Sequence, residues 1–235
     1  MIPQILHFLW ISITTADTPN ENLLRNIKIA LLNTTFDIYI HSNIEFDYPK
    51  SPRVRFFKRE FDLAVGGVPF TECKKFKRIA HIADIYRLDI LYEYGGVYSD
   101  WDVVWLRNPW EYLDHQLVIG YTNKAYKILC NAVMMAEKEH PALRVYRDWL
   151  IEIYPCAKYW IPANPYKLWK DRDDVTFAEK HVFFPIRWDE TSNLTLDKIQ
   201  KSIAIHEFAS TKTSRSGEVY EKLLRLTVRL NSEDR

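Results

Sequence analysis

The sequence predicts an α/β fold in which helices flank a mixed central sheet. Apolar runs of strand length alternate with longer segments of helical periodicity along the chain. Several of these runs are apolar throughout, as in strands whose two faces are both covered. In the second half two such runs follow each other without a helix between them, which indicates antiparallel pairing beside parallel strands.

The first part of the chain predicts the order strand, helix, strand, strand. Residues 4–11 form a short run rich in Ile, Leu, Phe and Trp, as expected of a buried strand. Leucine, isoleucine and alanine recur at helical spacing over 20–33. The next two strands are expected at 36–42 and 53–59, where apolar residues alternate or cluster.

The second part continues the alternation of helices and strands. A 3.6-residue period predicts a helix over 72–94 that stops at Gly95 and Gly96, and another helix is expected over 140–154. The remaining strands are expected at 97–106, 116–123, 130–137 and 202–208. No Gly-, Ser- or Pro-rich linker divides the chain, so we expect a single domain over residues 1–235.

Composition excludes several classes of protein. The 235 residues carry a formal net charge of +1, which gives no general basis for binding nucleic acid. Three widely spaced cysteines fit a reduced compartment, and no apolar run reaches membrane-spanning length, so we expect a cytoplasmic protein. The glycine-rich phosphate loops G-x-G-x-x-G and G-x-x-x-x-G-K-[ST] are absent from the sequence, so any diphosphate must be held in another way.

Two aspartates interrupt an apolar, β-prone run. Asp100 and Asp102 stand one residue apart in "VYSDWDVVWL", where burying an ionised carboxylate without compensation costs several kcal/mol. Two hard oxygen ligands suit Mg²⁺ or Mn²⁺, which completes its shell with substrate phosphates and water. A D-x-D triplet also arises by chance on many loops, so this motif alone leaves a structural role open.

The preceding helix offers one acceptor and one cation to the same region. Asp84 and Arg87 stand three residues apart and therefore share a helix face. An intrahelical ion pair worth a few tenths of a kcal/mol is the simpler interpretation. Together with the Gly-Gly pair and the D-x-D triplet, the spacing favours a site shared by the helix end and the strand.

Several blocks of the sequence resemble the DXD-containing sugar transferases of glycosyltransferase family 32. The central block "IADIYRLDILYEYGGVYSDWDV" is the specific one, and "IPQILHFLW", "NAVMMAEKEHP", "VFFP" and "IAIHEF" flank it in the family's order. The family includes α-mannosyltransferases and capsular sugar transferases, and it is related to the glucosylating domain of large clostridial toxins. The resemblance implies a GT-A-type nucleotide-sugar-binding fold.

The resemblance implies roles for the charged residues. Asp102 matches the aspartate that ligates the divalent metal, and Asp100 matches the one that contacts the donor ribose and the metal shell. Asp84 and Arg87 match the pair at the transferred sugar. His206 falls where the C-terminal strand returns to the metal and diphosphate, although a core histidine is an alternative.

Further donor contacts are implied in the same way. Trp10 matches an aromatic residue that stacks on the base, although a tryptophan in an apolar strand also fits a core position. Other residues expected at the donor are Tyr98, Ser99, Asn131, Ser210 and Lys212. Asn131 also fits a capping role. Family members usually carry a tryptophan shortly after the C-terminal histidine, and this sequence has none there, so Ser210 and Lys212 are expected at the diphosphate instead.

The resemblance implies a Mn²⁺- or Mg²⁺-dependent hexosyltransferase of polysaccharide biosynthesis that retains anomeric configuration. A UDP-sugar is the first candidate donor and a GDP-sugar the second, with a glycan or other hydroxyl acceptor and peripheral membrane contact as an option. Two alternatives stay open: a haloacid-dehalogenase-like phosphotransferase with Asp100 as nucleophile, and a non-catalytic carbohydrate-binding protein. In phosphotransferases of that type the aspartate motif generally opens the domain, whereas here 99 residues precede it.

Overall fold

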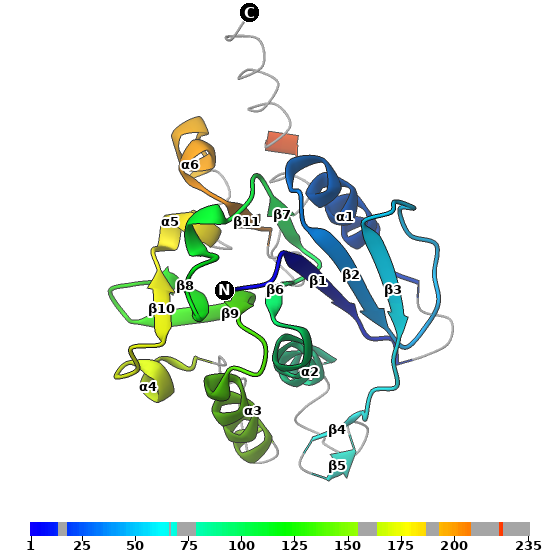
Figure 1. Cartoon of the computed structure of the whole chain (residues 1–235), viewed down its shortest axis with the longest axis horizontal. Coiled ribbons are helices and arrows are strands. Elements are labelled where there is room, and N and C mark those ends of the chain that lie inside the picture. The colour runs from blue at the N-terminus through cyan, green and yellow to red at the C-terminus, as the bar shows by residue number, and fades with distance from the viewer. Residues whose placement is uncertain are drawn as a thin grey trace, which may run out of the picture.

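A seven-stranded mixed sheet lies at the centre of the chain (Figure 1). The computed structural model describes residues 1–13, 18–65, 67–69, 79–154, 164–186, 193–207 and 221–222. The strands of this sheet, in spatial order, are β10 (Val175–Ala178), β8 (Leu117–Asn123), β9 (Ile128–Ala136), β6 (Gly96–Ser99), β1 (Ile5–Trp10), β2 (Asp37–Ser42) and β3 (Val54–Lys58).

The strand directions confirm that the sheet is mixed. β6, β1, β2 and β3 run parallel to one another. β9 is antiparallel to both β6 and β8, and β10 is parallel to β8. Two smaller sheets pair β7 (Val103–Trp105) with β11 (Ala204–His206), and β4 (Ala64–Val65) with β5 (Val68–Pro69).

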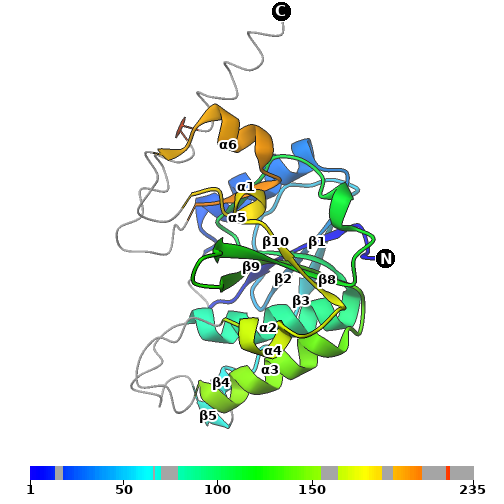
Figure 2. The ribbon, with the colours of Figure 1, turned by 90° about the vertical axis from the view of Figure 1, so that its left-hand side faces the viewer.

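Helices cover both faces of the central sheet (Figure 2). On one side lie α1 (Glu21–Asn33), α5 (Lys180–Phe183) and α6 (Leu196–Lys201). The other side carries α2 (Ile79–Tyr94), α3 (Pro141–Ile153) and α4 (Tyr166–Trp169). A 3-10 turn, η1 (Trp110–Tyr112), follows β7. Within the described part of the chain, no helix has the length and apolar character needed to span a membrane.

Alternation along the central strands divides the core into two layers. In β1, Phe8 packs with α1 and α5, whereas the next residue, Leu9, packs with α2 and α3. In β6, Val97 and Tyr98 divide in the same way. Successive side chains of a strand point to opposite faces, so a strand between two helical layers can be apolar on both faces. This is the reason for the continuous apolar runs in the sequence.

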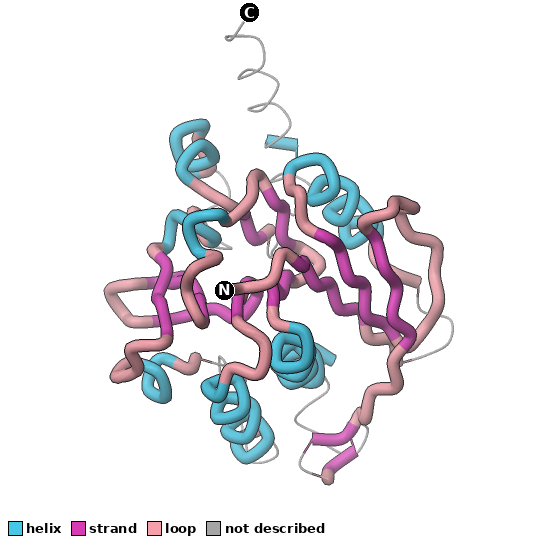
Figure 3. The backbone as a smooth tube through the Cα atoms, in the orientation of Figure 1, coloured by secondary structure: helices cyan, strands magenta, loops and turns pink. Residues whose placement is uncertain are grey.

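The observed elements differ from the sequence predictions at several points (Figure 3). The strand predicted over 97–106 is wrong as a single element, because residues 100–102 form a turn and β7 leaves the central sheet to pair with β11. The helix predicted over 72–94 is observed from Ile79, and residues 72–78 lie outside the described residues. Elements that the sequence analysis missed are β4, β5, β10, η1, α4, α5 and α6.

Gly95 and Gly96 connect α2 to β6, and the backbone at both positions requires glycine. Gly95 and Gly96 have φ angles of +66° and +93°, in the left-handed region that favours glycine. A Cβ atom on Gly95 would lie 2.7 Å from the backbone nitrogen of Lys138, and one on Gly96 would lie 2.7 Å from the backbone oxygen of Ile5. The chain therefore turns within van der Waals contact of its neighbours and enters the sheet beside β1.

A buried chain of hydrogen bonds fixes this turn to the neighbouring strands. The Arg59 Nε–H donates to His41 Nδ1 at 3.0 Å, so His41 carries its proton on Nε2. That proton faces His7 Nδ1 at 3.0 Å, and His7 Nε2 in turn donates to the backbone oxygen of Gly95 at 2.8 Å. The three bonds use every ring nitrogen of two neutral imidazoles and leave no place for a further proton.

Both histidines are therefore held in the neutral form. Burial and, to a smaller extent, the nearby Arg59 charge lower the pKa of His7 to about 4, against the bond to Gly95 and the Glu93 charge, which raise it. Burial, the His7 ring and Arg59 lower the pKa of His41 to about 2. Each folded-state pKa lies below the unfolded value of about 6.5, so the neutral pair stabilises the fold fully above pH 6.5. That stability is lost as the pH falls from 6.5 toward 4.

We predict that replacing His41 with Gln makes stability less dependent on pH. Below pH 6.5 each histidine that stays neutral only in the folded state contributes a slope of about 1.4 kcal/mol per pH unit. Urea unfolding of the wild type and of His41→Gln between pH 7.5 and 5 measures the difference. The wild type should lose stability more steeply, and equal slopes would contradict the neutral pair.

Candidate active site

The turn between β6 and β7 brings both aspartates of the D-x-D motif to the edge of the sheet. Ser99 pairs with Phe8 of β1, so Asp100 emerges at the carboxyl end of two neighbouring parallel strands. The backbone N–H of Val103 donates to the Asp100 carbonyl oxygen at 3.2 Å and closes the turn. Inside the turn, the indole N–H of Trp105 donates to Ser99 Oγ at 3.0 Å. The carboxyl edge of an open α/β sheet is where such folds bind ligands.

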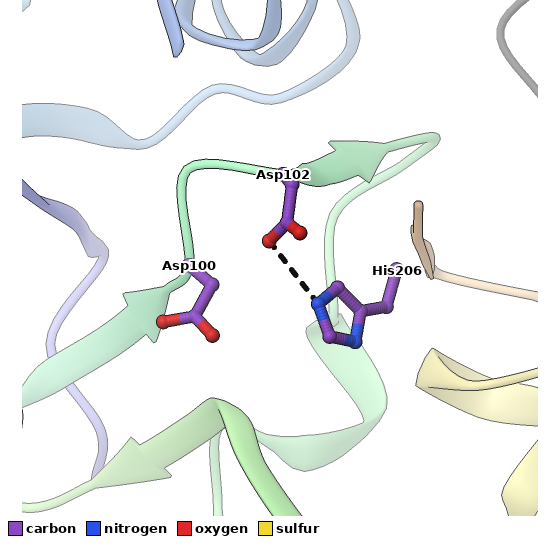
Figure 4. Close-up of side chains that lie close together, drawn as sticks. All are labelled: Asp100, Asp102 and His206. Atoms are coloured by element: carbon purple, nitrogen blue, oxygen red, sulfur yellow. Dashed lines mark hydrogen bonds and ion pairs between the residues drawn. The ribbon is translucent and has the colours of Figure 1, made fainter. Parts of the chain in front are cut away.

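The C-terminal strand completes a cluster of three potential metal ligands (Figure 4). β11 pairs antiparallel with β7, with His206 opposite Val103. One ligand atom from each of Asp100, Asp102 and His206 lies within 4.8 Å of the others. His206 Nε2 is 3.1 Å from Asp102 Oδ1, and all three side chains point toward a common centre. Residues 104 positions apart thus meet at one point.

Burial and neighbouring charges raise the pKa values of two residues in the cluster. Burial alone would lower the pKa of His206, but the Asp102 carboxylate raises it well above its ordinary value. Burial raises the pKa of Asp100, with Asp102 adding to the rise and Arg87 opposing it. The side chain of Asp100 is 22% exposed and that of Asp102 only 3% exposed, so Asp100 faces the open side of the cluster.

Arg87 on α2 connects this cluster to Asp84. Its Nη2 lies 3.0 Å from Asp84 Oδ1 and 3.1 Å from Asp100 Oδ1. Its Nη1 donates to the backbone oxygen of Asn131 at 2.6 Å, and the guanidinium lies 4.7 Å from the ring centre of Tyr98. Burial would lower the pKa of Arg87, but Asp100, Tyr98 and Asp84 together raise it well above its ordinary value. The arginine therefore stays charged between two carboxylates.

Part of the chain matches a known protein family. Residues 18–123 match the family model described as the glycosyltransferase sugar-binding region containing a DXD motif. This segment is therefore similar to the sugar-binding region of the DXD-containing glycosyltransferases. The matched segment holds Asp84, Arg87, Asp100 and Asp102, and it ends before Asn131 and His206. No curated protein sequence matches the chain.

Solved glycosyltransferases share the fold at low sequence identity. GlyE of Streptococcus pneumoniae TIGR4 superposes with a TM-score of 0.58 at 12% identity, over 99% of this chain and 63% of that one. The PaToxG glycosyltransferase gives 0.51 at 15% identity, over 73% and 72% of the two chains. A glycosyltransferase involved in glycosylation of the major capsid of PBCV-1 gives 0.50 at 8% identity, over 93% and 98%. These likenesses confirm a GT-A-like fold.

Asp84 is held by three neighbouring side chains. Besides the Arg87 contact, Asn131 Nδ2 donates to Asp84 Oδ1 at 2.8 Å, and the Tyr154 hydroxyl donates to Asp84 Oδ2 at 2.6 Å. The predicted residues Asp84, Arg87 and Asn131 therefore lie in one network. The sequence analysis missed Tyr154, because nothing in the local pattern at the end of α3 indicates a contact 70 positions away.

The other predicted donor residues differ in where the structure places them. Tyr98 reaches the network, since its hydroxyl donates to Asp100 Oδ1 at 3.0 Å. Ser99 is fully buried, and its hydroxyl bonds within the turn to the Asp100 carbonyl oxygen at 3.1 Å. Trp10 is partly buried at the end of β1, with its ring centre 6.3 Å from that of Trp101. Two further predicted residues, Ser210 and Lys212, lie outside the described residues.

We predict that Arg87→Lys destabilises the protein by about 2 kcal/mol, because a buried polar group that loses its hydrogen-bond donor costs about 1–3 kcal/mol. Lysine keeps the charge but cannot present a planar fork to two carboxylates and a carbonyl together. Arg147→Lys is the matched control, since Arg147 pairs with Asp89 of α2 at 2.5 Å but is 29% exposed. That change should cost under about 1 kcal/mol. Urea unfolding measures both, and equal losses would contradict the network.

Proposed function

We propose that this chain is a metal-dependent glycosyltransferase that moves a sugar from a nucleotide diphosphate sugar to a hydroxyl group of a glycan acceptor. A UDP-sugar is the first candidate donor and a GDP-sugar the second. The observation that carries the proposal is the convergence of Asp100, Asp102 and His206 beside Arg87 at the carboxyl edge of β1 and β6. We propose one glycosyltransferase domain over residues 1–235.

The chemistry of the three side chains fits a divalent cation, and Mn²⁺ better than Mg²⁺. Two carboxylates suit either ion, whereas imidazole is a ligand of transition metals rather than of Mg²⁺. Such an ion completes its shell with water and substrate phosphates, so three protein ligands are sufficient. When bound, it supplies Lewis-acid neutralisation of the charge that develops on the departing diphosphate.

The side chains of the network orient the donor in this proposal. Asp100, Asp102 and His206 hold the ion, and Arg87 places a permanent positive charge beside Asp100, 3.1 Å away, on the side nearer the sugar. Asp84 receives hydroxyl groups of the sugar, in an orientation fixed by its hydrogen bonds to neighbouring side chains. A carboxylate whose direction is fixed before the donor arrives costs less to order when it binds.

The base and the diphosphate are assigned to the edges of this network. Trp10 lies at the carboxyl end of β1 in edge contact with Trp101, and it offers a stacking surface for the base. Tyr98 and Asn131 support the ribose and sugar ends through their bonds to Asp100 and Asp84. Ser210 and Lys212 are proposed at the diphosphate, in place of the tryptophan that the family usually carries there. Ser99 is fully buried, so we propose that it supports the donor site from inside the turn, through its bonds to Trp105 and Asp100.

The pairing of the carboxylates supports retention of anomeric configuration. An inverting enzyme needs a carboxylate base behind the anomeric carbon. Among the described residues around the cluster, Asp84 and Asp100 pair with Arg87, Asp102 pairs with His206, and Glu207 pairs with Arg25. Each carboxylate is thus held in an ion pair, whose cation opposes protonation of the carboxylate, although burial raises the pKa of Asp100 and raises that of Glu207 to about 7. We therefore propose front-face attack assisted by the departing phosphate.

The phosphotransferase alternative loses support from the same contacts. Its nucleophile would be Asp100, whose Oδ1 already contacts both Arg87 and the Tyr98 hydroxyl. The match to a glycosyltransferase sugar-binding region and the fold of the solved neighbours also favour sugar transfer. A non-catalytic carbohydrate-binding protein would keep the site without turnover, and a turnover assay distinguishes it.

We predict that Asp102→Asn removes both metal-dependent nucleotide binding and sugar transfer. A ligand that binds only the folded state raises stability by mass action, about 2.7 kcal/mol at a hundredfold excess over Kd. In thermal-shift assays with UDP- and GDP-sugars, the wild type should be stabilised only when Mn²⁺ is present, and Asp102→Asn should not be stabilised. The control Asp114→Asn, at an exposed position, should behave as wild type.

Two outcomes would contradict the proposed function. Sugar transfer that persists undiminished in EDTA would exclude the metal role of Asp102. An aspartyl-phosphate on Asp100 during hydrolysis of simple phosphoesters would support the phosphotransferase instead.

A further inference from the structure

We propose that Asn26 of α1 is a positioning residue that holds the two halves of the metal cluster together. The inference rests on the proposed function, because it assigns Asn26 to the cluster of Asp100, Asp102 and His206. The two hydrogen bonds that Asn26 Nδ2 donates go to Trp101 and Glu207 rather than to these three side chains. It acts through the residues next to them in the chain.

Both the nitrogen and the oxygen of the Asn26 amide form hydrogen bonds. Its Nδ2 donates to the backbone oxygen of Trp101 at 3.0 Å and to Glu207 Oε2 at 3.1 Å. Its Oδ1 accepts the Nε–H of Arg25 at 3.1 Å, and Arg25 also forms an ion pair with Glu207 Oε2. Both donors face oxygens and the acceptor faces an N–H, so only one orientation of the amide satisfies the site.

The two bonds from Nδ2 reach the two separate segments that carry the cluster. Trp101 stands between Asp100 and Asp102, and Glu207 directly follows His206. The segments also meet through the backbone, where the N–H of Glu207 donates to the Asp102 carbonyl oxygen at 2.8 Å. Asn26 therefore closes the junction from the side of α1 and fixes the spacing between the D-x-D turn and β11.

Burial makes this junction rigid and costly to disturb. Asn26 and Glu207 are both fully buried. Removal of the amide would leave the Trp101 carbonyl oxygen without this donor in the interior and would leave the Glu207 carboxylate with Arg25 as its side-chain donor. A metal site depends on such supporting residues, whose loss typically weakens metal affinity by about 10- to 100-fold.

Asn33 provides a matched control on the same helix. Its Nδ2 donates to the backbone oxygen of Trp105 at 2.9 Å, so it also ties α1 to the chain that follows the D-x-D motif. Trp105 lies at the far end of β7 from the cluster, opposite Ala204 of β11. An effect of the general attachment of α1 would appear in variants of both asparagines, whereas an effect on the cluster is specific to Asn26.

The test is a titration of the full chain with Mn²⁺ alone, in which electron paramagnetic resonance measures the free ion. Asn26→Ala should raise the Mn²⁺ Kd by about 10- to 100-fold. Asn33→Ala should leave the Kd within about twofold of wild type, since it touches neither half of the cluster. Melting temperatures of both variants show whether a loss of fold accounts for a change in affinity. Should Asn26→Ala not fold, Arg25→Lys gives the same comparison, because lysine keeps a positive charge for Glu207 but lacks the Nε–H that orients the amide.

Each outcome decides the inference. An unchanged Kd in Asn26→Ala, or equal weakening in Asn33→Ala, would overturn it and leave the proposed function standing. A wild-type chain that binds no Mn²⁺ would overturn both, because there would be no cluster to position. Weakening confined to Asn26→Ala or Arg25→Lys in folded protein supports it.

Discussion

Buried negative charge is the constraint on which the rest of the site depends. Asp84, Asp100 and Asp102 lie close together in a largely apolar fold, and uncompensated burial of an ionised carboxylate costs several kcal/mol. Two cationic groups offset this cost, Arg87 between Asp84 and Asp100, and His206 beside Asp102. These partners compensate the negative charge of the aspartates. When a divalent cation binds, it would supply the positive charge that His206 supplies beside Asp102.

The compensation draws on elements that are far apart in the sequence. Arg87 comes from α2, which the Gly95–Gly96 turn joins to β6. His206 comes from β11, which reaches the site by pairing with β7. The buried histidine pair binds the Gly95 carbonyl oxygen and so holds the start of β6. The amide of Asn26 holds the cluster. The charged site is thus built on two rigid supports on opposite faces of the sheet.

The parts of the site that depend on local spacing could be predicted from the sequence. Asp84 and Arg87 were placed on one helix face because they stand three residues apart, and they do form an ion pair. The turn at 100–102 was predicted as part of one strand, because the residues on both sides of it have strand propensity, and the change of sheet comes from the pairing of β7 with β11. Asn26 left a readable signal, a polar residue on the buried face of α1 among Leu23, Ile27 and Ala30. Its partner at Glu207 gave none, because contacts across 181 positions leave no local pattern.

The central claim is that one metal ion binds between the D-x-D turn and β11, with His206 as a ligand. Pulsed electron paramagnetic resonance of the Mn²⁺-loaded protein tests it directly, because a coordinated imidazole nitrogen couples to the manganese spin. The account predicts nitrogen coupling in the wild type and its loss in His206→Gln. Bound Mn²⁺ without nitrogen coupling in the wild type, or coupling that persists in His206→Gln, would contradict it.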